Sequence, residues 1–155
     1  MQNPFATPTA SNLGFLAARA TLGAYFALAG YAKIFAPGGV PEFAKQNVGK
    51  VPAWFGPQLG NLYLAMLPLT EVVVGAALVA GFFTRSAAFL ASAMLASFIY
   101  AVTGVAWNEG GKPFHANVIF LGLALCILTN GGGNYTLPNI IGKKGGGKPP
   151  APPAK

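Results

Sequence analysis

Four long apolar runs, separated by short polar or glycine-rich stretches, account for most of this chain. They cover residues 13–35, 62–83, 86–105 and 114–129. A run of about 18 or more apolar residues is typical of a helix that crosses a membrane, and only the last run falls short of that length. It could still cross where the bilayer thins, or where His115 and Asn117 lie at the interface. The pattern therefore predicts an all-α membrane protein, a bundle of four transmembrane helices.

The apolar runs also divide the chain into segments. Residues 1–12 form a short N-terminal segment, and residues 13–141 form the transmembrane domain. The loop at 36–61 is long for a helical bundle, and such loops usually carry function or structure of their own. Its segment PEFAKQNVGK could form a short helix, with Phe43, Trp54 and Phe55 in the headgroups, or the loop could be an irregular cap over the bundle. The tail at 142–155 consists mostly of glycine, proline and lysine, so we predict that it is disordered.

The composition separates this chain from soluble domains. Hydrophobic residues make up 54% and charged residues only 8%, whereas a soluble domain carries about 25% charged residues. The net charge of +7 does not indicate nucleic-acid binding, because four of the ten basic residues lie in the tail and most others flank the apolar runs. We therefore expect the lipid bilayer, and no nucleic acid, as the partner of the chain.

The basic residues also predict how the helices are oriented. Four crossings place the N-terminus, the turn at Arg85 and the C-terminal tail on one side of the membrane. That side carries the lysines of the tail, and its basic bias favours the cytoplasm. The opposite side carries a belt of aromatic residues: Tyr31, Trp54, Tyr63, Tyr100 and Trp107. The sequence thus predicts a multi-pass protein of the inner (cytoplasmic) membrane with both termini in the cytoplasm.

Small residues recur every three or four positions along two of the predicted helices. The stripe on the first helix consists of Ala17, Ala20, Ala24 and Ala27. The stripe on the third consists of Ala88, Ser92 and Ala96. In lipid, where apolar burial gives helices no driving force to associate, small residues allow two backbones to approach closely. We therefore predict that both stripes form helix–helix contacts in the bundle.

A carboxylate, Glu71, lies near the middle of the second apolar run. Its placement at mid-bilayer costs at least ~2.5 kcal/mol, so Glu71 should face protein and have a partner. Arg19 lies within the first run, at a different depth from Glu71. Its long side chain can span much of this difference in depth, so we predict an Arg19–Glu71 ion pair. This pair could be catalytic or could only fix the helix register. In the alternative, Arg19 extends to the headgroups and Glu71 is protonated.

A second set of polar residues falls in the first and fourth apolar runs. Lys33 lies at the outer end of the first run, and His115 and Asn117 lie at the outer end of the fourth. A cation, an imidazole and an amide suit the carbonyl oxygens of a quinone, or a small anion. Tyr25 places a phenol deeper in the first run, where it could bond a carboxylate or a quinone carbonyl. The alternatives are an interfacial lysine, a solvated histidine and a core tyrosine. The candidate quinone-binding residues are Lys33, Tyr25, Glu71, His115 and Asn117. The candidate catalytic residues are Glu71, Arg19 and His115.

Several chemistries have no residues in this sequence to carry them. Neither GxxxxGK[ST] nor GxGxxG occurs, so no phosphate-binding loop is predicted. With one histidine and one cysteine, the chain cannot by itself ligate a haem through two histidines or hold an iron–sulfur cluster. We predict no metal site and no covalently bound cofactor. A redox centre would have to be a diffusible quinone or belong to a partner.

The order of these residues resembles that of the DoxX family, small membrane proteins of four helices. ARATLGAYFALAGYAKIF is similar to the family's first helix, and TEVVVGAALVAGFFTR to its second helix and the turn after it. The segment from His115 through GGGNYTL is similar to the fourth helix and its glycine stop. The resemblance covers residues 13–137. One departure is Pro138, where the family usually has an acidic residue.

The resemblance implies a membrane subunit of a quinone-linked oxidoreductase complex, completed by other membrane or redox subunits. Family members resemble the quinone-reducing subunit of thiosulfate oxidation or a small subunit of a terminal quinol oxidase, and others are accessory proteins. Because a shared fold does not determine a reaction, whether this chain is an enzyme stays open. The alternatives are a non-catalytic accessory or assembly subunit of a larger membrane complex, and a small-molecule carrier in which Glu71 exchanges a proton.

Overall fold

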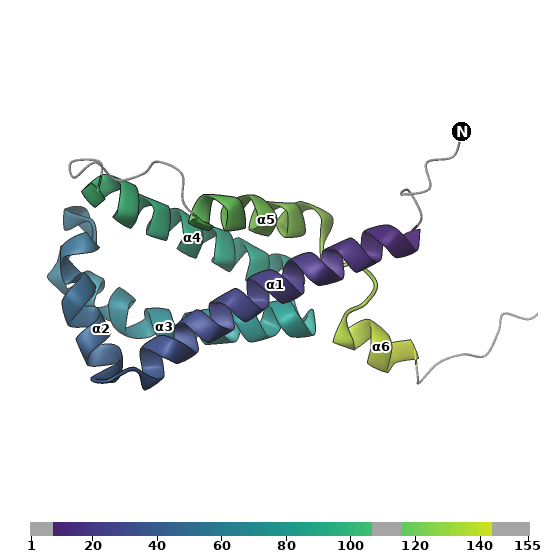
Figure 1. The fold of residues 1–155 in the computed structure, drawn as a ribbon, viewed down its shortest axis with the longest axis horizontal. Helices are drawn as coiled ribbons and strands as arrows, with labels where there is room; N and C mark the ends of the chain where they lie inside the picture. Colours follow the sequence, from purple (N-terminus) through teal and green to yellow (C-terminus); the bar gives the residue numbers. More distant parts are fainter. Residues whose placement is uncertain (1–7, 107–115, 144–155) are drawn as a thin grey trace, which may run out of the picture.

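The computed structural model describes residues 8–106 and 116–143, and within these ranges the chain forms helices and no strand (Figure 1). Four helices form the body of the molecule. They are α1 (Pro8–Phe35), α3 (Gly56–Ala80), α4 (Thr84–Ala106) and α5 (Ala116–Asn130). Each of them lies on one of the four apolar runs. The all-α prediction is therefore confirmed for the part of the chain that the structure describes.

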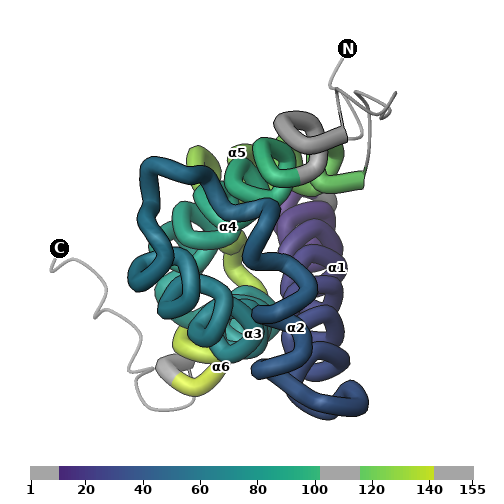
Figure 2. The backbone as a smooth tube through the Cα atoms, turned by 90° about the vertical axis from the view of Figure 1, so that its left-hand side faces the viewer, coloured from purple at the N-terminus to yellow at the C-terminus, as the bar shows by residue number. Residues whose placement is uncertain are grey.

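Short helices occupy the long loop between α1 and α3. The helix α2 (Gly39–Asn47) is followed by two 3-10 turns, η1 (Val48–Lys50) and η2 (Ala53–Phe55). Of the two expectations for this loop, the structure has the short helix. We refer to residues 38–55 as the cap, because they lie across one end of the bundle in Figure 2.

The helix bounds differ most from the sequence prediction in three places. α1 begins at Pro8 and not at residue 13. α3 begins at Gly56 and not at residue 62, since Pro57 is favourable in a first helical turn, where its missing N–H has no partner to lose. A further short helix, α6 (Leu137–Lys143), runs into the start of the predicted tail. The expectations for residues 1–7, for the rest of the tail and for residues 107–115 lie outside the described residues.

The four long helices form two antiparallel pairs. α1 packs against α3 and α4 packs against α5, while α3 also contacts α4 and α1 contacts α5. The cap lies at the end of the bundle where α1 finishes and α3 begins, which we call the cap end (Figure 1). The opposite end, which we call the turn end, carries the start of α1, the α3–α4 turn and α6 (Figure 1).

Glycines, together with Ala27 of the predicted alanine stripe, make the closest contact between α1 and α3. A Cβ atom on Gly75 would lie 2.5 Å from the carbonyl oxygen of Gly23, and one on Gly23 would lie 2.6 Å from that of Gly75. Neither position has room for a side chain. The predicted stripe was wrong for Ala17 and Ala24, whose side chains are exposed. Gly23 and Gly30, two turns apart, define the face of α1 that meets α3, and that face excludes both alanines.

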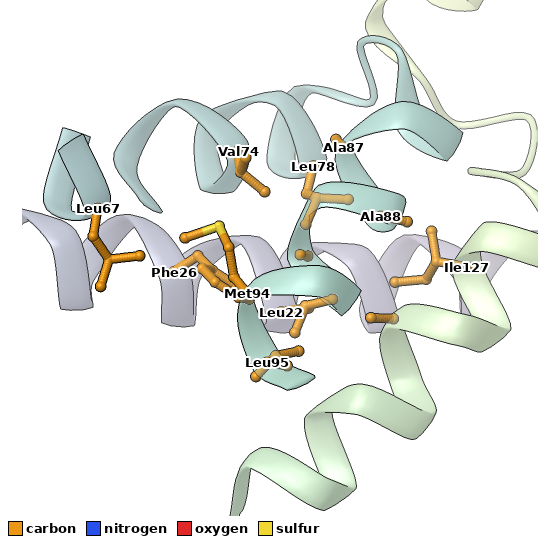
Figure 3. Packing of buried hydrophobic residues seen from close by; sticks show 12 residues of the cluster. Leu22, Phe26, Leu67, Val74, Leu78, Ala87, Ala88, Met94, Leu95 and Ile127 are labelled. Carbon is orange, nitrogen blue, oxygen red and sulfur yellow. The ribbon is translucent and has the colours of Figure 1, made fainter. Parts of the chain in front are cut away.

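The core of the bundle is apolar, and all four long helices contribute to it (Figure 3). Its fully buried members include Leu22, Phe26, Leu78, Leu95 and Ile127. Of the predicted stripe on α4, Ala88 and Ser92 are buried and Ala96 is exposed. Small side chains on α4 thus allow its backbone to approach the larger side chains of its neighbours.

Two segments are long and apolar enough to cross a membrane, by length and composition: Ser11–Phe35 and Ala53–Ala80. α4, with 23 residues, has a length of about 35 Å at the α-helical rise. α5, with 15 described residues, has a length of about 22 Å, less than the roughly 30 Å of a bilayer core.

The outer face of α3 shows what surrounds the bundle. Leu62, Met66, Leu69 and Val73 recur at helical spacing and are all at least half exposed. An exposed stripe of large apolar residues is unfavourable in water and suits acyl chains. With the apolar helices, this face supports the assignment of the chain as a membrane protein.

Candidate functional site

A cavity of about 480 Å³ lies at the cap end, between the cap and the four long helices. Aromatic rings form much of its wall: Tyr25, Phe43, Trp54, Phe55, Tyr63, Phe98 and Tyr100. Its polar and charged lining residues are Lys33, Asn47, Lys50, Glu71, Ser97 and Asn117. A concave, mostly apolar site with a few converging polar groups is the usual form of a small-molecule site.

Glu71, in the middle of α3, forms an ion pair with Lys33 of α1 at the wall of this cavity. The ammonium Nζ of Lys33 donates a hydrogen bond to Glu71 Oε1. The side chain of Glu71 is only 2% exposed, and that of Lys33 is 25% exposed. Glu71 therefore faces protein, as predicted, and a basic residue neutralises its charge.

The predicted Arg19–Glu71 pair is wrong, and the direction of helical side chains explains why. α1 and α3 are antiparallel, with Gly23 beside Gly75, so Glu71 lies at a level between Arg19 and Lys33. Side chains in a helix tilt toward its N-terminus. In this pair of helices, Lys33 and Glu71 therefore tilt toward each other, whereas Arg19 tilts away from Glu71.

Arg19 is buried near the turn end of the bundle, away from the cavity. Its side chain lies against Gly81 at the C-terminus of α3, where the helix carbonyls carry partial negative charge. Its Nη2 donates to the carbonyl oxygen of Tyr135, after α5, while Nε and Nη1 have no hydrogen-bond partner among the described residues. Arg19 thus fastens the segment after α5 to α1 and α3.

Gly81 is the residue that makes room for this guanidinium. It has a φ of 75° at the end of α3, and the next amide, that of Phe82, donates to the carbonyl oxygen of Ala77 at 2.9 Å. Many helices end in this way at a glycine, because glycine readily adopts the left-handed backbone conformation. A Cβ atom at Gly81 would overlap Nη1 of Arg19.

Two aromatic rings flank the ammonium group of Lys33. Its Nζ lies 5.2 Å from the ring centroid of Phe43 and 5.6 Å from that of Phe98. A cation over an aromatic face is attracted by the ring quadrupole. The half-buried Phe43 of α2 thus lines the cavity, and its expected insertion into the headgroups was wrong.

Tyr25 and Asn117 meet on another side of the cavity. The hydroxyl of Tyr25 donates to Asn117 Oδ1 at 3.3 Å. The ring of Tyr25 also stacks on Phe120 of α5, with centroids 4.3 Å apart. The structure therefore brings Lys33, Tyr25, Glu71 and Asn117 to one cavity, while His115 lies outside the described residues.

Tyr63 and Ser97 form a polar contact that the sequence did not predict. Their oxygens lie 2.6 Å apart, and Ser97 also donates to the carbonyl oxygen of Met94 at 2.7 Å. The sequence pattern assigned Tyr63 to the aromatic belt, and a single serine in an apolar run carries no spacing signal. Only the packing of α3 against α4 identifies these two residues as part of the site.

Residues 8–106 and 116–143 contain no group of three His, Cys, Asp or Glu side chains that could hold a metal ion. Cys126 is exposed on α5 and does not line the cavity. The arrangement can bind a flat apolar molecule between aromatic rings, orient its polar atoms and exchange a proton with a buried carboxyl group.

Comparison with known families agrees with this geometry. The sequence matches the DoxX family model over residues 14–104, a range that contains most of α1, the cap, α3 and most of α4. It includes Lys33 and Glu71, while Asn117 lies beyond it. Because the match covers more than half of the chain, the protein belongs to the DoxX family, as its sequence predicted. Searches of curated proteins and of solved structures find no significant match.

Proposed function

We propose that this DoxX-family membrane protein is the membrane subunit of a quinone-linked oxidoreductase complex and that its cavity holds the ring of a quinone. The observation that carries the proposal is the Lys33–Glu71 pair in the wall of an aromatic cavity. Ionisable residues inside membrane helices are expensive to bury, and they commonly mark functional sites.

The residues of the cavity fit a quinone ring. A volume of 480 Å³ falls within the roughly 300–1,000 Å³ of small-molecule sites. The rings of Phe43, Phe98 and Tyr63 offer apolar surface to a flat molecule. Glu71 Oε2 is buried and has no hydrogen-bond partner among the described residues, so a polar atom of a ligand would satisfy it.

The charges of the site favour a neutral ligand over the small anion that the sequence also allowed. Lys33 and Glu71 cancel each other's charge within the cavity wall. An anion beside Lys33 would also approach the carboxylate of Glu71, which repels it. A quinone carries no net charge and avoids this repulsion.

Each group of the site has a role in this proposal. A bound quinone would supply the two-electron redox chemistry, and a partner subunit would supply the electron donor. Glu71 would hold or release a proton at Oε2, and Lys33 would keep the carboxylate in place. The cap would exclude water from the ring. Arg19, near the turn end, takes no part in this site, and His115 stays a candidate from the sequence alone.

Quinone binding by the purified protein is the direct test. In mild detergent we expect saturable binding of a short-chain benzoquinone, followed by calorimetry. Phe98→Ala removes a ring from the cavity wall and should weaken binding about tenfold, equivalent to about 1.4 kcal/mol. The matched control is Phe89→Ala on the same helix, whose side chain is 61% exposed and whose loss should leave affinity unchanged. Wild-type protein that co-purifies with a membrane complex but binds no quinone would instead support the accessory role.

We also propose that α1, α3, α4 and α5 cross the inner membrane, with the cap end outside the cell interior and both termini in the cytoplasm. Four antiparallel helices that alternate in direction support this topology (Figure 1). The basic tail favours the cytoplasm for the end from which it emerges.

Cysteine labelling of intact cells tests this topology. In a Cys126→Ala background, an impermeant maleimide should label Lys50→Cys on the cap directly. It should label Ser86→Cys, in the α3–α4 turn region, only after the membrane is permeabilised. Both positions are exposed in the structure, so access to the reagent differs only by the side of the membrane. Equal labelling of both positions before permeabilisation would contradict the proposed crossing.

A further inference from the structure

We infer that the cavity prefers the reduced form of its ligand, a hydroquinone with two ring hydroxyl groups, over the oxidised quinone. This inference rests on the proposed function and narrows it. It follows from a buried carboxylate oxygen of Glu71 that has no hydrogen-bond partner among the described residues, and from two phenols whose hydroxyl hydrogens are used within the protein. A quinone carbonyl can only accept a hydrogen bond, whereas a hydroquinone hydroxyl can also donate one.

Tyr63 has its hydroxyl hydrogen engaged within the protein. Ser97 carries one hydroxyl hydrogen and donates it to the carbonyl oxygen of Met94 at 2.7 Å. In the 2.6 Å contact between Tyr63 and Ser97, the donor must therefore be Tyr63. What Tyr63 has left for a ligand is the lone pairs of its oxygen.

Tyr25, on another side of the cavity, also has its hydroxyl hydrogen engaged within the protein. Its hydroxyl donates to Asn117 Oδ1 at 3.3 Å, so its oxygen too has only lone pairs left for a ligand. The ring of Tyr25 stacks on Phe120, which holds the phenol in this orientation. Two phenols of the wall, which a sequence would suggest as donors to a carbonyl, therefore act as acceptors.

The two lysines of the wall, Lys33 and Lys50, do not distinguish the two forms of the ligand. The ammonium group of Lys33 donates to Glu71 Oε1 and lies over the rings of Phe43 and Phe98. At the rim, Lys50 donates to Asn47 Oδ1 at 3.0 Å. Each ammonium group has three N–H donors and each of these hydrogen bonds uses one, so the others remain for a ligand oxygen. A hydroquinone hydroxyl can accept from them just as a quinone carbonyl can.

Glu71 supplies the strongest acceptor of the site. Its Oε2 is buried and has no hydrogen-bond partner within residues 8–106 and 116–143. In its ion pair with Lys33 the carboxylate accepts hydrogen bonds and donates none. A ligand hydroxyl would satisfy this oxygen, whereas a ligand carbonyl would place two acceptors against each other.

Three small ligands test this preference on the full-length protein in lipid nanodiscs under anaerobic conditions. They are tetramethylhydroquinone, its dimethyl ether, which lacks both donors, and tetramethylbenzoquinone. By calorimetry we expect the hydroquinone to bind about tenfold tighter than either of the others, the effect of one good hydrogen bond to a charged acceptor. The ether separates the loss of donors from the change of oxidation state.

Two variants identify the acceptors. Glu71→Gln exchanges an acceptor-only group for an amide that also donates, so the preference for hydroquinone should fall about tenfold. Tyr63→Phe removes one acceptor and should weaken hydroquinone binding about threefold, with the quinone unchanged. The control is Tyr31→Phe, an exposed tyrosine outside the cavity. Should Glu71→Gln fail to fold, Tyr63→Phe decides.

The outcomes separate this inference from the function on which it rests. If the wild-type protein binds none of the three ligands, the proposed quinone site fails and the preference fails with it. If it binds quinone as tightly as hydroquinone, or more tightly, the quinone site stands and the preference is overturned. If the ether binds as well as the hydroquinone, the donors are not recognised and the preference has another origin.

Discussion

Gly75→Ala is expected to lower the midpoint temperature of thermal unfolding in detergent by about 3 to 10 °C, the consequence of overpacking by roughly 1–3 kcal/mol. The new Cβ would lie 2.5 Å from the carbonyl oxygen of Gly23 and 2.9 Å from the Cα of Ala27. Both atoms belong to the backbone of α1, so no side chain can rotate away. α1 and α3 would have to move apart along the interface that they share.

The matched control is Gly122→Ala in the interior of α5. A Cβ atom there would have nothing within 4 Å. The substitution should be neutral, or should stabilise the helix by up to about 1 kcal/mol through the better helix propensity of alanine. Circular dichroism at the helix band measures both variants. Equal midpoints for the two would show that the glycine contact between α1 and α3 does not govern stability.

Removing one partner of the Lys33–Glu71 pair is expected to lower stability as much as Gly75→Ala does, or more. Lys33→Met leaves the carboxylate of Glu71 buried without its cation, and breaking a buried pair in this way typically costs about 3–5 kcal/mol. Replacing both residues with methionine should recover much of the loss, because two apolar side chains of similar volume leave no uncompensated charge. The readouts are the thermal midpoint and the yield of monodisperse protein in size-exclusion chromatography.

Two further variants make this result specific. Lys45→Met removes an exposed lysine from α2 and should change neither readout. The exchange Lys33→Glu with Glu71→Lys should assemble better than either single change, since the two side chains tilt toward each other. Arg19→Glu with Glu71→Arg should give no such rescue. If that second exchange restored assembly and the first did not, the pairing described above would be wrong.

The sequence predicted the helices well because each one is an uninterrupted apolar run. Lipid cannot satisfy a backbone amide, so a run of this kind in a membrane protein must form a helix whatever its neighbours are. The burial of Glu71 followed from the same cost of charge in lipid, and the structure confirms it with a side chain 2% exposed. The family resemblance was confirmed over residues 14–104.

The sequence pattern predicted the contacts between helices less well. Of the alanine stripe on α1, Ala27 meets α3 beside Gly23, Gly30 and Gly75, whereas Ala17 and Ala24 are exposed. α1 has more than one face of small residues, and only its packing against α3 decides which face forms the contact. Likewise Arg19 and Lys33 were both cations of suitable depth for Glu71. The choice between them depended on the antiparallel packing of α1 and α3 and on the tilt of side chains toward each helix's N-terminus.

By itself the sequence determined that this protein is helical and membrane-embedded, where its helices lie, and that a buried acid needs a partner. These properties depend on the cost of exposing polar groups to lipid, which is local to each segment. The tertiary structure alone decided that Lys33 is the partner, that the cap and four helices enclose one cavity, and that Tyr25 and Tyr63 donate to protein atoms. Those features depend on the relative rotation of helices, which short-range sequence patterns do not encode.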